Sequence, residues 1–175
     1  MIFREITLPV QLTRGSLVDI ETSGLPIERE AEAITIGYVI GNKIHIIQRT
    51  GKDGKQAFLD QLPSLPRPIY AFNKGFEERF LGIKIDGELQ LRPFERKREA
   101  IRIEGLKDPF DGYGRYARDA WALHIRNDDL SYIEAVMQHN VCCLLSELCL
   151  LISRSVSHLG NRQPQPDTRI RGVLT

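Results

Sequence analysis

Two carboxylates stand almost side by side in the stretch "SLVDIETSGL", which spans residues 16–25. Asp19 and Glu21 follow the apolar residues Leu17 and Val18, and their spacing of two places both acids on one face of a strand. Two carboxylates this close repel each other unless a cation lies between them. Since hard cations such as Mg²⁺ prefer carboxylate oxygens, the pair predicts a metal site at the end of a core strand. The alternative interpretation is a solvent-facing strand end with two ordinary acids.

The stretch "LVDIETSGL" resembles the first motif of the DEDD 3′–5′ exonucleases, a family with the ribonuclease H-like fold. The family's second motif is a strand that ends in Asn and is followed by a Phe and an Asp. In this chain "YAFNKGFEERFL" supplies Asn73, Phe76 and Glu77 at those positions. The resemblance covers residues 14–152 and implies an α/β fold with a mixed central sheet flanked by helices.

The family's third motif lies on a late helix and has the form Tyr-Asn-x-x-Asp in its YprB-type members. The stretch "HNVCC" is similar to this form and places His139, Asn140 and Cys143 at its defined positions. Two residues depart from the family pattern. Glu77 adds a methylene to the expected Asp, and Cys143 stands where the fourth acid belongs. The nearest later acid is Glu147, about one helical turn beyond Cys143.

The resemblance implies an enzyme that shortens single-stranded nucleic acid from its 3′ end with two Mg²⁺ or Mn²⁺ ions. The implied catalytic and metal positions are Asp19, Glu21, Glu77, His139 and the corner at Cys143. The implied substrate contacts are Thr22, Gly24, Leu25, Asn73, Phe76 and Asn140. His139 would orient or deprotonate the attacking water. Because the fourth acid is missing, the alternative is a catalytically lapsed domain of the same fold that binds nucleic acid or a protein partner.

A second alternative uses the cysteines of the same segment. His139, Cys142 and Cys143 are three and four residues apart, which places them on one face of a helix. Nitrogen and sulfur are the ligands that zinc prefers, so this face is a candidate zinc site. The sequence offers no fourth ligand with a paired-knuckle spacing, and cysteines flanked by leucines usually pack as small apolar side chains.

Hydrophobic periodicity and turn residues predict the elements that must position these groups. The predicted strands cover residues 3–10, 16–21, 33–41, 43–50 and 67–73, with a hairpin turn at the Gly-Asn-Lys of 41–43. The predicted helices cover residues 55–65, 74–83, 113–125 and 130–156. Asp128, Asp129 and Ser131 are candidate caps for the last helix. Tyr116 and Trp121 are expected in the core.

Composition sets the remaining expectations. The chain has 175 residues and a formal net charge of +1, so only a local patch could attract nucleic acid. Residues 92–102 hold five bases against two acids, which indicates either a solvated face or a phosphate-contacting patch. Three clustered cysteines, no visible signal peptide and an apolar run interrupted by Glu147 predict a cytoplasmic protein without a membrane span. We expect one domain at 1–159 and a flexible tail at 160–175.

Overall fold

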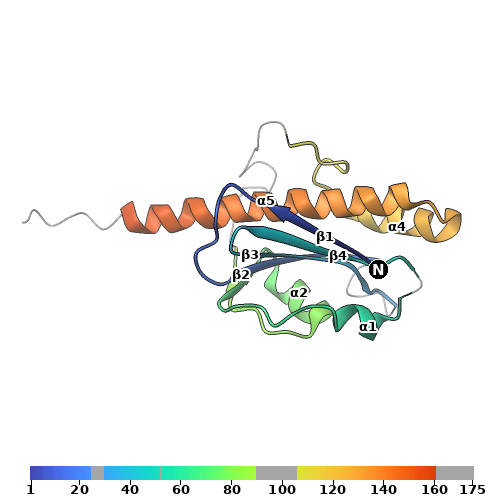
Figure 1. Cartoon of the computed structure of the whole chain (residues 1–175), viewed down its shortest axis with the longest axis horizontal. Helices are drawn as coiled ribbons and strands as arrows, with labels where there is room; N and C mark the ends of the chain where they lie inside the picture. Colours follow the sequence, from blue (N-terminus) through green and yellow to red (C-terminus); the bar gives the residue numbers. More distant parts are fainter. Residues whose placement is uncertain (25–29, 52, 90–105, 161–175) are drawn as a thin grey trace, which may run out of the picture.

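The computed structural model describes residues 1–24, 30–51, 53–89 and 106–160, and places a six-stranded mixed β-sheet at its centre (Figure 1). The strands are β1 (Ile2–Thr7), β2 (Ser16–Thr22), β3 (Ala33–Ile40), β4 (Lys43–Gln48), β5 (Ile69–Ala71) and β6 (Gly87–Glu88). The helices are α1 (Lys55–Leu59), α2 (Lys74–Leu81), α4 (Arg115–Asn127) and α5 (Leu130–Gly160). Helix α5 covers one face of the sheet, while α1 and α2 lie on the other face (Figure 1). The expected α/β class with a mixed, helix-flanked sheet is confirmed at this level.

The strand order is β1-β4-β3-β2-β5-β6. The first four strands in this order pair antiparallel, whereas β5 pairs parallel to β2 and β6 pairs parallel to β5. The predicted hairpin is the antiparallel pair of β3 and β4, and Gly41 turns it with a φ of 59°. Glycine adopts a positive φ without the steric cost that a Cβ atom would add. Strand β2, which carries both acids of the opening motif, therefore lies inside the sheet between β3 and β5.

The two faces of β2 bury different groups. Val18 and Ile20 belong to the core cluster that contains Phe58 of α1 and Phe80 of α2. Leu17 belongs to the cluster on the other face, where it is grouped with apolar side chains of α5 such as Leu144. Because side chains alternate along a strand, Asp19 and Glu21 share the α5 face with Leu17, as the sequence predicts.

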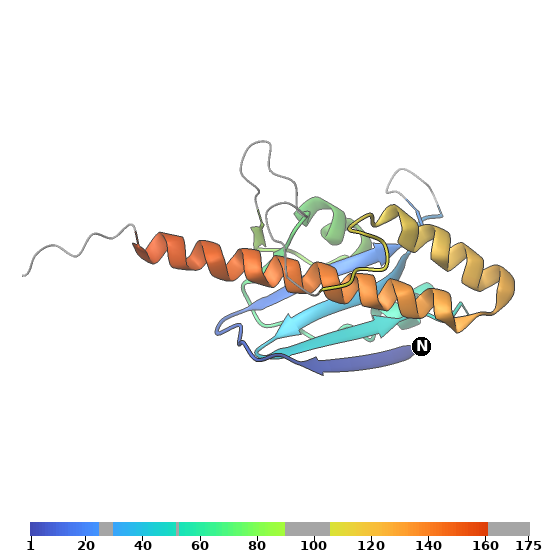
Figure 2. The ribbon, with the colours of Figure 1, turned by 90° about the horizontal axis from the view of Figure 1, so that it is seen from above.

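Helix α5 lies along the sheet with α4 beside it, as Figure 2 shows from above. The backbone N–H of Ser131 donates to the Asp129 carboxylate over 2.8 Å, so Asp129 confirms the expected acid cap at the start of α5. Residues Leu130–Ile152 are long and apolar enough to cross a membrane by length and composition, and half of this stretch is buried in the structure. The core helix of a soluble protein has the same properties, so this finding leaves the expected location as a prediction.

Some local expectations needed correction. The helix predicted over 55–65 is confined to Lys55–Leu59, and the strand predicted over 67–73 to Ile69–Ala71. Tyr116 is 40% exposed, so its prediction as a core residue is wrong, whereas Trp121 is partly buried against the core. The basic stretch 92–102 lies outside the described residues. The expected domain boundary at 159/160 falls at the last residues of α5.

Candidate functional site

Asp19 and Glu21 lie near the end of β2 beneath α5, and each is 7% exposed. Asn140 of α5 is fully buried, and its Nδ2 donates a hydrogen bond of 2.8 Å to Asp19 Oδ2. Hydrogen bonds to a charged group are stronger than those between neutral groups. Asn140 thus fixes one oxygen of Asp19 and attaches the helix to the central strand.

A glycine permits this close approach. Gly37 of β3 stands directly opposite Asp19 in the register of the sheet. A Cβ atom built on Gly37 would overlap Asn140 Oδ1 and would lie 2.6 Å from Leu144 Cδ1. Only a residue without a side chain at position 37 lets α5 pack closely enough for Asn140 to reach Asp19.

His139 precedes Asn140 on α5 and is 1% exposed. Its Nδ1 lies 2.8 Å and 2.9 Å from the two carboxylate oxygens of Asp108. Asp108 also accepts hydrogen bonds of 2.8 Å from the backbone N–H groups of Phe110 and Gly112. Burial alone would raise the pKa of Asp108, but the hydrogen bonds from His139 and from these amides outweigh it, so the pKa of Asp108 is lowered.

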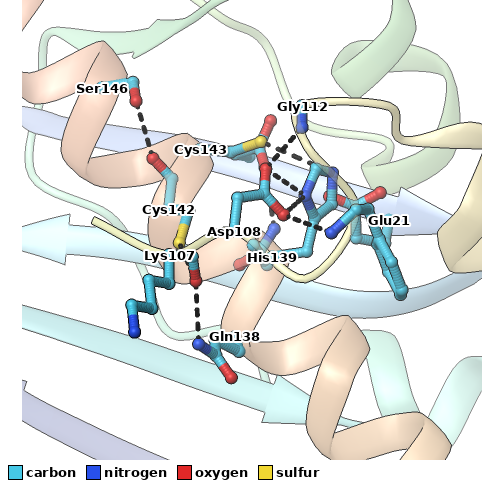
Figure 3. Close-up of polar contacts among 12 residues, drawn as sticks. Glu21, Lys107, Asp108, Gly112, Gln138, His139, Cys142, Cys143 and Ser146 are labelled. Carbon is cyan, nitrogen blue, oxygen red and sulfur yellow. Dashed lines mark hydrogen bonds and ion pairs between the residues drawn. The ribbon is translucent and has the colours of Figure 1, made fainter. Parts of the chain in front are cut away.

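The lowered pKa keeps Asp108 ionised at neutral pH. A carboxylate can only accept, so the hydrogen of the His139–Asp108 bond resides on Nδ1. The other ring nitrogen, Nε2, then faces the acids of β2. It lies 3.6 Å from Glu21 Oε1 and 3.7 Å from Cys143 Sγ (Figure 3).

Glu21, His139 and Cys143 form a compact group of potential metal ligands, which we call the Glu-His-Cys cluster. One ligand atom from each residue lies within 4.8 Å of the other two. Among the residues that the structure describes, no other three Asp, Glu, His or Cys side chains bring their ligand atoms this close together. Gly114 borders the cluster, because a Cβ built there would lie 3.6 Å from Glu21 Oε2 and 3.8 Å from His139 Nε2.

Cys142 does not belong to this cluster. Its Sγ points to the carbonyl oxygen of Lys107, 3.8 Å away, on the side of α5 shown below Cys143 in Figure 3. Burial, followed by the nearby Asp108 carboxylate, raises the pKa of the Cys142 thiol to about 11. The alternative of a face formed by His139, Cys142 and Cys143 thus differs from the structure in one member, since Glu21 of β2 joins His139 and Cys143 where Cys142 does not.

The residues of the second motif lie on the element that the sequence predicts. Asn73 is the N-cap of α2, and its Oδ1 accepts a 3.3 Å hydrogen bond from the backbone N–H of Phe76. The Phe76 ring packs 5.0 Å from that of Phe80, against the core cluster of that face. Both residues thus have local structural roles, and their expected substrate contacts stay predictions.

Glu77 lies in the first turn of α2 and is 2% exposed. Helix α2 follows β5, and β5 runs parallel to β2. Helix α2 therefore begins at the same end of the sheet as the C-terminal end of β2. Glu77 and Asp19 do not join the Glu-His-Cys cluster at its 4.8 Å distance. Glu147, two helical turns beyond His139, is fully buried on α5.

The remaining residues of the opening motif form the turn after β2. Thr22 Oγ1 donates a 2.6 Å hydrogen bond to the carbonyl oxygen of Gly24. This bond tightens the turn next to Glu21, and Gly24 itself is buried. Leu25, an expected substrate contact, lies outside the described residues.

Two residues of the site, Asp108 and Gly37, escaped the sequence reasoning. Asp108 is 31 residues from His139 in the chain, so no local periodicity links them. The stretch "KDPFDGYG" contains the signal for a turn, since Asp followed by Pro and later glycines favours chain reversal. Gly37 carries no signal by itself, because its importance lies in which side chains approach it.

The donor types of the site can be compared with the metals that the resemblance implies. Asp19 and Glu21 offer the oxygens that Mg²⁺ and Mn²⁺ prefer. Imidazole nitrogen and thiolate sulfur are donors for zinc and related transition metals. Because two of the donors, His139 and Cys143, are a nitrogen and a sulfur ligand, the site does not fit a pair of magnesium ions held by four acids.

No family model, curated protein or solved structure matches the chain. The fold and the site define the protein as an α/β domain with a six-stranded mixed sheet and a largely buried Glu-His-Cys cluster at the end of a central strand.

Proposed function

We propose that the chain is a ribonuclease H-like nuclease domain that hydrolyses phosphodiester bonds at the 3′ ends of single-stranded nucleic acid with a divalent metal ion. The observation that carries the proposal is the meeting of two separate motifs. Asp19 and Glu21 project from the end of β2, and His139 and Asn140 of α5 lie directly against them. Sequence segments more than a hundred residues apart thus contribute to one polar site inside an otherwise apolar interface.

The element order also supports the proposal. The acid pair lies on a central strand, Glu77 lies in the first turn of the helix after a parallel strand, and His139 lies on a late helix. These are the three kinds of element on which the resemblance expects its three motifs. The mixed sheet with helices on both faces agrees with the implied architecture.

The residues themselves have separable roles in this proposal. His139 Nε2 faces Glu21 at 3.6 Å and helps to position groups bound there, and Asp108 holds its ring in one orientation and one tautomer. Asn140 holds Asp19 in place through its side-chain amide. Glu21 and Asp19 would hold a divalent ion through their carboxylate oxygens, and the chemistry it would supply is the polarisation of water and of the phosphate.

An aromatic and basic group borders the site and supports nucleic acid as the substrate. Tyr113 and Tyr116 are each 40% exposed, and the guanidinium carbon of Arg115 lies 5.2 Å and 4.9 Å from their ring centroids. Gly114, which borders Glu21 and His139, stands between them in the chain. Exposed aromatic rings stack on unpaired bases and arginine pairs with phosphates, so this group is a surface on which a single strand can lie.

Tyr116→Ala is therefore expected to weaken binding of a single-stranded oligonucleotide by about tenfold, because one stacked base contributes about 1–3 kcal/mol. Fluorescence anisotropy with a labelled oligonucleotide, in the absence of divalent ions, measures the dissociation constant without cleavage. Phe3→Ala is the matched control, since Phe3 is a 61% exposed ring on the distant edge strand β1. Equal affinities for the wild type and Tyr116→Ala would remove this surface from the proposal.

Asp19→Asn tests the activity itself. Removing one carboxylate that binds a divalent ion costs several kcal/mol of transition-state stabilisation, so we expect a rate at least about 100-fold lower. The assay follows end-labelled single-stranded DNA and RNA with Mg²⁺, Mn²⁺ or Zn²⁺, and stepwise shortening from the 3′ end is the expected product pattern. Glu5→Gln, the same acid-to-amide change at an exposed ion pair with Lys43 on the sheet edge, should keep full activity. A folded wild-type protein that cleaves neither substrate with any of the three metals would refute the enzymatic proposal.

A second candidate function is a lapsed nuclease domain that binds nucleic acid without cleaving it. Cys143 favours it, because a thiol stands where the resemblance expects the fourth acid, and Asn140 already bonds to one oxygen of Asp19. Binding that weakens steeply with added salt and is accompanied by no turnover would identify this function.

A further inference from the structure

We propose that the Glu-His-Cys cluster is a binding site for one zinc ion. This inference goes beyond the proposed nuclease function, because it concerns the three donor types on α5 and β2 and holds whether or not the protein cleaves nucleic acid. The cluster supplies an oxygen, a nitrogen and a sulfur, all of which zinc accepts.

The distances between the donors agree with tetrahedral zinc. Bond lengths of about 2.0 Å to oxygen and nitrogen and about 2.3 Å to sulfur place neighbouring ligand atoms about 3.3–3.6 Å apart in a tetrahedron. His139 Nε2 lies 3.6 Å from Glu21 Oε1 and 3.7 Å from Cys143 Sγ. These two distances exceed the tetrahedral values by only a few tenths of an ångström, and the ligand atoms of the third pair, Glu21 and Cys143, lie within 4.8 Å of each other.

Asp108 prepares His139 for this role. Metal-binding histidines usually donate their second ring N–H to a carboxylate or carbonyl, which fixes the tautomer and the ring orientation. The Asp108 carboxylate accepts from Nδ1 and is itself held by two backbone amides of its own loop. The lone pair of Nε2 then points at the other two donors of the cluster (Figure 3).

Gly114 borders the cluster without adding a side chain to it. Glycine contributes no side chain there, and the nearest cluster atoms lie 3.6 Å and 3.8 Å from where a Cβ would stand. Three protein ligands with a fourth position for water or substrate are typical of reactive zinc sites, whereas structural sites use four protein ligands. Because the cluster supplies three protein ligands, a bound ion would keep its fourth position for water or another small group.

The same distances also fit an arrangement without metal. Without an ion, His139 would be held by its ion-pair contacts with Asp108 and Glu21 and by a weak contact to Cys143. The arrangements with and without metal differ in how strongly they depend on the Cys143 thiol. Zinc requires the Cys143 thiolate as a strong ligand, whereas the ion-paired histidine is held by the two carboxylates and hardly depends on the sulfur.

The test measures metal on the full chain without nucleic acid. We expect purified protein to retain about one zinc per chain by elemental analysis. Removal with a chelator and replacement by Co²⁺ should give the near-ultraviolet charge-transfer band of a thiolate–cobalt bond. Cys143→Ser should abolish this band and weaken zinc binding at least about 100-fold. Asp108→Asn, which leaves all three ligands in place, should weaken zinc binding by about tenfold or more while keeping the band.

Cys149→Ser is the matched control, because it makes the same chemical change at an exposed position of α5. It should retain both the band and the wild-type zinc affinity. Two outcomes would overturn the site: zinc affinity that is equal in wild type and Cys143→Ser, or a folded wild type that binds no zinc. The nuclease assay is not used here, so a protein that binds zinc but cleaves nothing would refute the enzymatic proposal alone.

Discussion

Replacing Cys143 by aspartate is expected to exchange the metal preference of the site. The substitution removes the one thiolate and adds two hard oxygens at the corner where the resemblance expects the fourth acid. Zinc affinity should fall about 100-fold or more, because the soft donor is lost. Cleavage of single-stranded nucleic acid with Mg²⁺ or Mn²⁺ should rise, since the new carboxylate adds hard oxygen ligands next to Glu21. Zinc competition and the end-labelled nuclease assay measure the two effects on the same preparation.

Position 143 of α5 can accommodate an aspartate side chain. Cys143 is only partly buried, and aspartate is similar to cysteine in size, so the charge can be hydrated or bind an ion. Cys143→Ser separates the loss of sulfur from the gain of a carboxylate, because it should lose zinc without gaining magnesium-dependent activity. Adding Asp19→Asn to Cys143→Asp should cancel any gained activity. Unchanged zinc affinity and an unchanged rate with Mg²⁺ in Cys143→Asp would show that residue 143 touches no metal.

Replacing Gly37 by alanine is expected to destabilise the fold strongly. The new methyl group would overlap Asn140 Oδ1 and crowd Leu144, so either α5 moves away from the sheet or Asn140 leaves Asp19. Overpacking costs about 1–3 kcal/mol, and a hydrogen bond to a charged group contributes about 1.5–3 kcal/mol. Alanine recovers about 0.5–1 kcal/mol through the lower entropy of its unfolded chain. We therefore expect the free energy of unfolding to fall by about 2–4 kcal/mol, measured by urea denaturation.

Gly75→Ala provides the control for this prediction. Gly75 lies in α2, and a Cβ built on it meets nothing within 4 Å, so alanine there should stabilise the protein by up to about 1 kcal/mol. The double variant Gly37→Ala/Asn140→Ala should lose less than the sum of its single variants, because the overlap requires both side chains. Wild-type stability in Gly37→Ala would contradict the close contact between α5 and β3.

Local sequence was sufficient for those features that depend on neighbours along the chain. The alternation of "LVDIE" places Asp19 and Glu21 on one face of β2 because successive side chains of a strand point to opposite sides. Asp129 caps α5, and Gly41 turns the hairpin of β3 and β4, since caps and turns are made by residues a few positions apart. Whether the site hydrolyses phosphodiester bonds remains a prediction of the resemblance.

The tertiary structure decided what depends on residues far apart in the chain. Strand β1 pairs with β4 at the sheet edge and not with β2, its neighbour in sequence. Cys142 and Cys143 are adjacent and chemically identical, yet the rotation of about 100° between consecutive helical residues points only Cys143 toward Glu21. Asp108 meets His139 because a loop folds back over α5. The sequence alone determined which residues could bind a metal, whereas the packing of α5 on β2 determined which of them meet.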